Sequence, residues 1–182
     1  MTIASRHLTA SELEAGLEEI RRAPKDGGTL EMIVRRPAVG ERELMQEGQL
    51  DLAEGLVGDN WSTRGGGRPN PDTQLTVMNA RVAALVSQDA SRWQLAGDQL
   101  YIDLDLSDDN LPTGTQLAIG SAVIEVSAIP HTGCAKFVER FGLDAMKFVN
   151  EGEGKFRHLR GINTRVVVPG VIRVGDRATK KT

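Results

Sequence analysis

The stretch QLAIGSAVIEVSAI, residues 116–129, predicts two short strands joined by a tight turn at Gly120-Ser121. Residues 160–176 follow the same pattern, with apolar segments on either side of a Pro169-Gly170 turn. Between residues 99 and 106 apolar and polar side chains alternate strictly, which is typical of a half-buried strand. Short strands separated by Gly and Pro turns predict a mainly β fold, an antiparallel β-barrel with a few short helices.

The other elements are predicted by the same signals. We expect further strands at residues 30–34, 41–47 and 74–78, a hairpin of 160–168 with 171–174, and helices at 10–23, 80–87, 135–141 and after Asp144. In strand 99–106, the alternation predicts that Tyr101, Asp103 and Asp105 face solvent. The chain of 182 residues suits one domain, so we interpret residues 1–29 as a helical extension and 30–178 as the barrel.

Composition limits the classes of function. The formal net charge of -3 argues against a nucleic-acid binder or a protein of anionic membrane surfaces. Neither a secretory signal nor an apolar run of membrane-spanning length is recognisable, and a single cysteine is typical of a reducing compartment, so we expect a cytoplasmic protein. Arginines crowd the last quarter of the chain, where an anion site is more readily built.

Cys134 is the only cysteine and therefore has no internal disulfide partner. It precedes the expected helix 135–141, where backbone N–H groups favour an anion, and His131 and Lys136 add positive character. These neighbours favour a reactive thiolate, although a lone cysteine also occurs as a small buried apolar residue. A thiolate is a soft ligand that suits a transition metal or a transferable sulfur atom.

Other chemistries of this cysteine are less well supported. The three histidines and one cysteine lack the spacing of a structural zinc site. His131 and Cys134 would form the pair of a thiol-dependent hydrolase, but the sequence offers no third residue that orients the histidine. Hydrolysis therefore stays a minor alternative.

A glycine-rich loop at residues 63–71 contains Arg64 and Arg68 around three consecutive glycines. Its backbone N–H groups and guanidinium groups could bind a phosphate, which makes both arginines candidates for that role. The loop matches neither the dinucleotide-binding fingerprint nor the Walker loop, and a flexible surface loop is the alternative.

Several short motifs surround the cysteine in a fixed order. They are Gly55 to Trp61, Pro130 to Phe137, Arg140 to Ala145, Leu159 to Gly170 and Val174-Gly175-Asp176. Together they resemble the MOSC domain, a module found at the C-terminus of molybdenum cofactor sulfurases and as stand-alone bacterial proteins. The resemblance extends from about residue 30 to residue 178.

The resemblance implies a barrel that binds the molybdenum cofactor, a pterin with a dithiolene and a phosphate. Cys134 matches the family cysteine and is implied as the catalytic residue, either a molybdenum ligand or a sulfur carrier. The cofactor-binding candidates are His131, Lys136, Arg160, Asn163 and Arg165, together with Arg64 and Arg68 for the phosphate. Arg165 and Asn163 are expected to share a strand face that Arg160 does not.

Three functions stay open. The first is cofactor handling or sulfur transfer, and the second is a molybdenum-dependent reductase of N-hydroxylated compounds that needs external electron donors. The third is a non-catalytic barrel for protein interaction. The expected partners are the small-molecule cofactor and a sulfur-donor or electron-donor protein, with no nucleic acid and no membrane. No aminotransferase-like desulfurase domain is recognisable, so pyridoxal phosphate stays an association at the family level.

Overall fold

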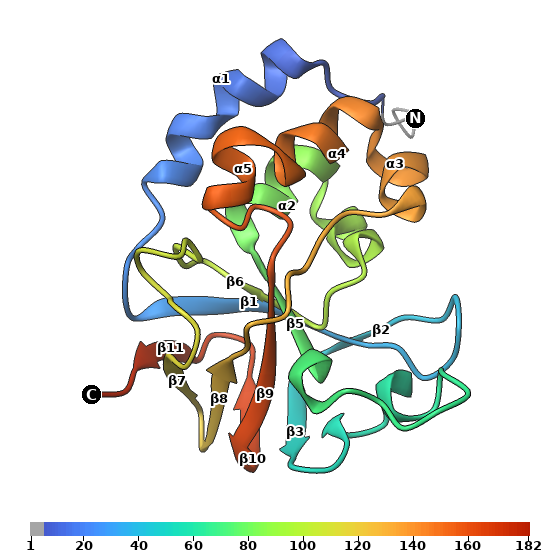
Figure 1. The fold of residues 1–182 in the computed structure, drawn as a ribbon, viewed down its shortest axis with the longest axis vertical. Coiled ribbons are helices and arrows are strands. Elements are labelled where there is room, and N and C mark those ends of the chain that lie inside the picture. Colours follow the sequence, from blue (N-terminus) through green and yellow to red (C-terminus); the bar gives the residue numbers. More distant parts are fainter. Residues whose placement is uncertain (1–5) are drawn as a thin grey trace.

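The computed structural model describes residues 6–182, and a closed barrel forms its lower half (Figure 1). Its strands follow one another around the barrel as β11, β7, β8, β9, β5, β6 and β1, and β1 pairs again with β11 to close it. Their bounds are β1 Gly28–Arg35, β5 Leu75–Asn79, β6 Leu100–Ile102, β7 Gln116–Ile119, β8 Ala122–Val126, β9 Ile162–Val168 and β11 Arg177–Lys180. Closure leaves neither β1 nor β11 with an open edge along the paired residues.

Two smaller pieces of sheet adjoin the barrel. β2 (Glu43–Met45) pairs only with β1, so the loop between these two strands extends beyond the barrel wall. A separate three-stranded sheet is made of β3 (Glu47–Asp51), β4 (Gly55–Leu56) and β10 (Gly170–Arg173).

The barrel is mixed, and the prediction of a purely antiparallel barrel was wrong on this point. β5 and β6 are parallel, with Val77 opposite Leu100 and Asn79 opposite Ile102. Between them the chain forms α2 (Ala80–Ser87) and a 3₁₀ helix (Ala90–Ala96). This crossover carries the chain back to the end of the barrel at which β5 begins. β6 must start there in order to run parallel to β5.

The tight turn predicted at Gly120-Ser121 is confirmed. β7 and β8 pair antiparallel, with Ile119 opposite Ala122, and Gly120 has a positive φ of 56°. That backbone conformation costs glycine little, which explains why the hairpin signal at this position is reliable.

The predicted hairpin of 160–168 with 171–174 does not form. β10 pairs instead with β3, placing Ile172 opposite Gly48 and Arg173 opposite Glu47. Pro169 has no N–H to donate to a continuous two-stranded ladder, and β10 turns away to the smaller sheet.

Strand 99–106 also differs from its prediction, because β6 ends at Ile102. Tyr101 is fully buried rather than exposed, and its hydroxyl donates to the carbonyl of Trp93 at 2.7 Å. Asp105 is mostly buried and accepts a hydrogen bond from the Lys25 ammonium at 2.9 Å. Helices cover this face at Tyr101, which packs in the apolar core beneath them, and at Asp103, which pairs with Arg81 of α2.

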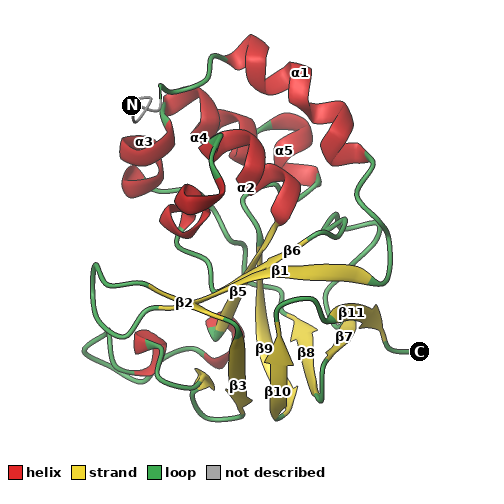
Figure 2. Cartoon of the chain, turned by 180° about the vertical axis from the view of Figure 1, so that it is seen from behind, coloured by secondary structure: helices red, strands yellow, loops and turns green. Residues whose placement is uncertain are grey.

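Five helices form a layer over one end of the barrel, coloured red in Figure 2. Besides α2 they are α1 (Ala10–Arg21), α3 (Ala135–Phe141), α4 (Leu143–Asn150) and α5 (Gly152–Phe156). Further 3₁₀ turns lie at Asn60–Ser62 and Pro71–Thr73. None of the helices within residues 6–182 is both long and apolar enough to cross a membrane.

The protein has two apolar cores. One fills the barrel and includes Leu30, Leu100 and Ile124. The other lies between the helices and the barrel end and includes Leu13 of α1 and Phe137 of α3. Burying a side chain of this size contributes roughly 1.5–3 kcal/mol, so α1 and α3 are both held by packing. The division of the chain at residue 30 stays a prediction.

Gly28 provides a test of the close packing at the barrel seam, since a Cβ there would lie 2.1 Å from the carbonyl oxygen of Asp103. We expect Gly28→Ala to lower the free energy of unfolding by about 1–3 kcal/mol, because backbone must move to relieve the overlap. The matched control is Gly65→Ala, where no atom lies within 4 Å. Urea denaturation measures both, and equal stability of the two variants would contradict the close contact.

Candidate functional site

Cys134 lies at the junction of a loop and a helix. The chain leaves β8, crosses residues 127–133 and enters α3, of which Cys134 is the N-cap residue with extended backbone angles. The side chain is exposed, so the alternative of a small buried apolar residue does not hold.

Three polar side chains hold the segment 129–134 that leads to this cysteine. Asn163 donates its amide N–H groups to the carbonyls of the segment's first two residues, at 3.0 and 3.2 Å. The Asp98 carboxylate is 2.8 Å from Nε2 of His131. Asn150 accepts a 2.9 Å hydrogen bond from the backbone N–H of the residue before the cysteine. The thiol is therefore exposed on a segment with fixed attachments.

Asp98 is a fully buried carboxylate at the centre of these attachments. Its second oxygen accepts a 2.6 Å hydrogen bond from Arg160, whose guanidinium also donates to the carbonyl of Ala96. Burial alone would raise the pKa of Asp98, but the charges of Arg160 and His131 outweigh it and hold the pKa at about 2. Asp98 is thus ionised at neutral pH.

One nitrogen of the Arg160 guanidinium has no hydrogen-bond partner among the described residues. Its guanidinium lies over the ring of Phe137, 5.1 Å from the centroid, and is 7% exposed. Nε of Arg160 is buried without a hydrogen-bond partner in the part of the chain that the structure describes. A buried, unpaired donor of this kind is costly unless a ligand or water satisfies it.

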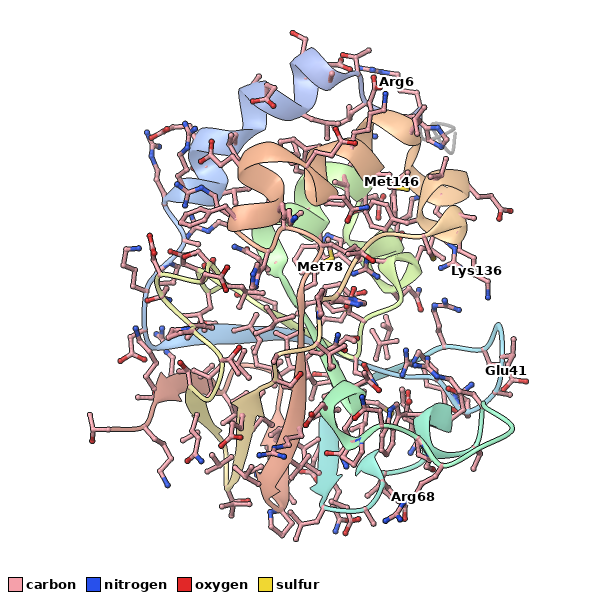
Figure 3. The ribbon with its side chains drawn as sticks, in the orientation of Figure 1. Arg6, Glu41, Arg68, Met78, Lys136 and Met146 are labelled. Carbon is pink, nitrogen blue, oxygen red and sulfur yellow. The ribbon has the colours of Figure 1, made fainter. Side chains whose placement is uncertain are left out.

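A pocket of about 460 Å³ opens beside Cys134, and most of the charged side chains that line it are basic. Among residues 6–182, Glu41 is its only acidic lining residue. The basic lining residues are Arg36, Arg42, Arg64, Lys136, Arg140 and Arg160. In Figure 3, Lys136 of α3 and Glu41 of the loop before β2 lie on the same side of the molecule.

Two of these arginines are neutralised, whereas the others are not. Arg36 forms a 2.7 Å ion pair with Asp59, and Arg160 pairs with Asp98. The other four have no carboxylate within ion-pair distance in the described part of the chain, and they are Arg42, Arg64, Lys136 and Arg140.

Partial burial and the repulsion between these cations lower the pKa values of two of the arginines. Partial burial, followed by the positive charges of Arg140 and Arg36, lowers the pKa of Arg42. Partial burial and Arg36 likewise lower the pKa of Arg64. Both groups stay protonated, so the pocket holds unbalanced positive charge that favours an anion.

The same field acts on the thiol. Partial burial would raise the pKa of Cys134, but the backbone N–H dipoles of Phe137 and Lys136 and the charges of Arg160 and Arg140 lower it below its ordinary value. The sulfur accepts no capping hydrogen bond from the first turn of α3, so the N–H dipoles of that turn act on it through space. The thiolate is therefore more accessible at neutral pH than in an isolated cysteine.

The structure brings together five of the predicted cofactor-binding residues with Cys134. Arg64, His131, Lys136, Arg160 and Asn163 all line its pocket.

Arg68 and Arg165 lie elsewhere. The side chain of Arg68 is exposed, away from the pocket lining. Arg165 of β9 is exposed, whereas Asn163 two positions before it is buried, and Arg165 forms ion pairs with Glu125 at 2.7 Å and Asp72 at 3.5 Å. A cofactor role for either arginine stays a prediction without support from the pocket geometry.

Sequence reasoning missed five further residues of the site. They are Arg36, Arg42, Asp98, Arg140 and Asn150. Arg140 could have been predicted, because it lies within a motif next to the cysteine. Arg42 is about ninety positions from Cys134, and no sequence pattern links it to the site. Within the described residues, no three His, Cys, Asp or Glu side chains cluster as a metal site.

Fold and site together define a helix-capped mixed β-barrel with a cation-lined pocket beside an exposed thiol. The MOSC domain description matches residues 69–179, more than half of the chain, and the chain belongs to the MOSC domain family. This family is associated with molybdenum cofactor binding.

Solved structures have the same fold. YuaD from Bacillus subtilis is 15% identical with a TM-score of 0.56, covering 83% of this chain and 93% of that chain. YiiM from Escherichia coli is 20% identical with a TM-score of 0.56, covering 85% and 70%. YiiM from Geobacillus stearothermophilus is 14% identical with a TM-score of 0.54, covering 86% and 74%. At these identities the likeness concerns the fold alone. No curated protein matched the sequence.

The lowered pKa of Cys134 can be tested by alkylation with iodoacetamide over a range of pH. We expect the midpoint of the rate profile to lie below that of an ordinary thiol, and Arg140→Gln to raise it, because one of the charges favouring the thiolate is lost. Arg165→Gln is the matched control outside the pocket and should leave the midpoint unchanged. An equal shift in both variants would exclude a local effect.

The buried Asp98 should be essential for stability. We expect Asp98→Asn to lower the free energy of unfolding by about 3–5 kcal/mol, because it leaves Arg160 buried without its counter-ion. Glu47→Gln, which breaks an exposed ion pair with Arg173, should change it by less than about 1 kcal/mol. Urea denaturation at neutral pH compares the two variants.

The depressed pKa of Asp98 also predicts a pH dependence. The unfolded carboxyl has an ordinary pKa near 3.8 and the folded one about 2, so its ionisation stabilises the fold above pH 4 and this contribution is lost towards pH 2. The stability difference between the native protein and Asp98→Asn should shrink by about 2 kcal/mol over that interval. A constant difference from neutral pH to pH 2 would contradict an ionised Asp98.

Proposed function

We propose that the pocket beside Cys134 binds the molybdenum cofactor. The observation that carries the proposal is the group of four cations without carboxylate partners around an exposed thiol. The cofactor is anionic at its phosphate and has a soft metal at its dithiolene, so one ligand would use both features.

The residues present fit this group. The unpaired Nε of Arg160 offers a donor inside the site, and Arg42, Arg64 and Arg140 offer guanidinium forks that match phosphate oxygens. The pocket volume of about 460 Å³ lies within the range of small-molecule sites. We assign the phosphate to Arg42 and Arg64, and the metal end to Cys134.

The role of the site is cofactor handling with Cys134 as metal ligand or sulfur carrier. When bound, the molybdenum cofactor supplies two-electron redox chemistry at its metal. The chain itself positions the thiol through Asp98, Asn150 and Asn163, and its backbone dipoles and basic neighbours lower the pKa of the thiol. Sulfur transfer is favoured by the exposure of the thiol, which a donor protein could reach.

A molybdenum-dependent reductase of N-hydroxylated compounds is the second candidate. The sequence shows no iron–sulfur or flavin motif, so this function requires an external electron donor. Turnover of an amidoxime with an artificial electron donor separates it from a carrier, which would hold cofactor or persulfide without turnover.

The first experiment expresses the protein in a host that makes the molybdenum cofactor and measures molybdenum and oxidised-pterin fluorescence after purification. We expect near-stoichiometric contents in the native protein. Cys134→Ala should lose the metal, since the thiolate ligand is gone. Arg42→Gln should lower the pterin content, because the phosphate loses a charged donor.

A control variant makes the result specific. Arg165→Gln removes an arginine outside the pocket and should keep the molybdenum and pterin contents of the native protein. A native protein free of molybdenum and pterin, purified from cells that contain the cofactor, would overturn the proposal. Persulfide on Cys134 without metal would assign the carrier role instead.

A further inference from the structure

A second cavity, of about 680 Å³, adjoins the pocket of Cys134. Residues 129–132, Arg160 and Asn163 line both, so the segment that leads to the cysteine is a common wall. The rest of its lining comes from residues 108–113, 126–128 and 161–162, the end of α4 and residues 152–158. The lining of this cavity therefore differs in large part from that of the Cys134 pocket.

The lining of this cavity is apolar at its base and at its rim. Leu111, Val126 and Ile162 are buried and form part of the base. Ile129 and Phe156 are large apolar side chains that are nevertheless 37% and 46% exposed. Exposed apolar side chains in a concave site favour an apolar ligand, and a phenyl ring favours a flat aromatic one.

One charged group at the rim is free to bind a ligand. Lys155 lines the cavity, and its ammonium has no ion-pair or hydrogen-bond partner within residues 6–182. The acidic lining residue Asp108 is 62% exposed, with Nε2 of His158 3.2 Å away. Among the described residues, Lys155 is therefore the cation of this lining that has no carboxylate partner.

His158 has an unusual backbone conformation, with a positive φ. Its φ is 52°, a conformation that only one other non-glycine residue adopts in the described part of the chain. The conformation is held by hydrogen bonds from its N–H to Lys155 and from the N–H of Gly161 to its carbonyl. It places Nε2 of His158 3.2 Å from Asp108, the acidic residue of the lining.

We propose that this cavity binds a small aromatic organic anion, with its ring against Ile129 and Phe156 and its anionic group at Lys155. The volume of about 680 Å³ accommodates a molecule of two or three fused or linked rings. The two side chains that would hold this ligand, Lys155 and Phe156, do not line the pocket of Cys134, so the ligand needs no molybdenum cofactor to bind.

The test uses cofactor-free protein and two fluorescent probes, 8-anilinonaphthalene-1-sulfonate and its uncharged analogue N-phenyl-1-naphthylamine. Lys155→Gln should weaken binding of the sulfonate about three- to tenfold, and that of the uncharged analogue less than about twofold. Phe156→Ala should weaken binding of both probes. Both side chains are exposed, so an unchanged thermal midpoint is expected and shows that the variants are folded.

The matched control is Lys147→Gln, which removes an exposed lysine of α4 that lines neither cavity. It should leave sulfonate binding unchanged. An equal loss of sulfonate affinity in Lys147→Gln and Lys155→Gln, or no loss in Lys155→Gln, would overturn the proposal. Because no molybdenum is involved, these outcomes are separate from those of the cofactor experiment.

Discussion

One buried carboxylate joins the parts of the chain that form the site. Asp98 follows the crossover between β5 and β6, His131 belongs to the segment before the cysteine, and Arg160 precedes β9. A buried charge is stable only when its partners compensate for lost hydration, so the three elements must assemble together. The net stability of such a group is small compared with apolar packing, and its main effect is on geometry: it fixes where the thiol-bearing segment lies.

The cation-lined pocket has an energetic cost of its own. Arg42 and Arg140 repel each other across partly desolvated space, and no described carboxylate neutralises either one. A folded protein optimised for stability alone would pair these charges. An anion that enters the pocket removes the repulsion, and part of the binding energy is therefore present in the unliganded protein as electrostatic strain.

Local signals predicted much of the fold. The turn at Gly120, the helix start at Cys134 and the basic character around it follow from residue types within a few positions. Long-range pairing did not follow, since nothing near Pro169 indicates that β10 joins β3 rather than β9. The strict alternation of 99–106 was misleading for a related reason: helices, not water, cover its polar face.

The site was predictable only where its residues are close in sequence or belong to the family motifs. Lys136 and His131 flank the thiol, and Arg160 and Asn163 lie in a recognisable motif. Arg42 enters from the loop between β1 and β2, which reaches the pocket only because that strand pair extends beyond the barrel. A charge that a distant loop supplies leaves no local pattern, and three-dimensional structure is needed to find it.

The closure of the barrel has a consequence for how the protein is made. The pairing of β1 with β11 closes the barrel and joins Gly28 to Ala178, which are 150 positions apart (178 less 28). β1 therefore cannot complete its pairing until β11 is present. A growing chain on the ribosome holds β1 unclosed on that side until β11 has been synthesised. During that interval the edge of β1 is open to other strands, and the arrival of β11 determines whether the nascent chain closes on itself or pairs with another.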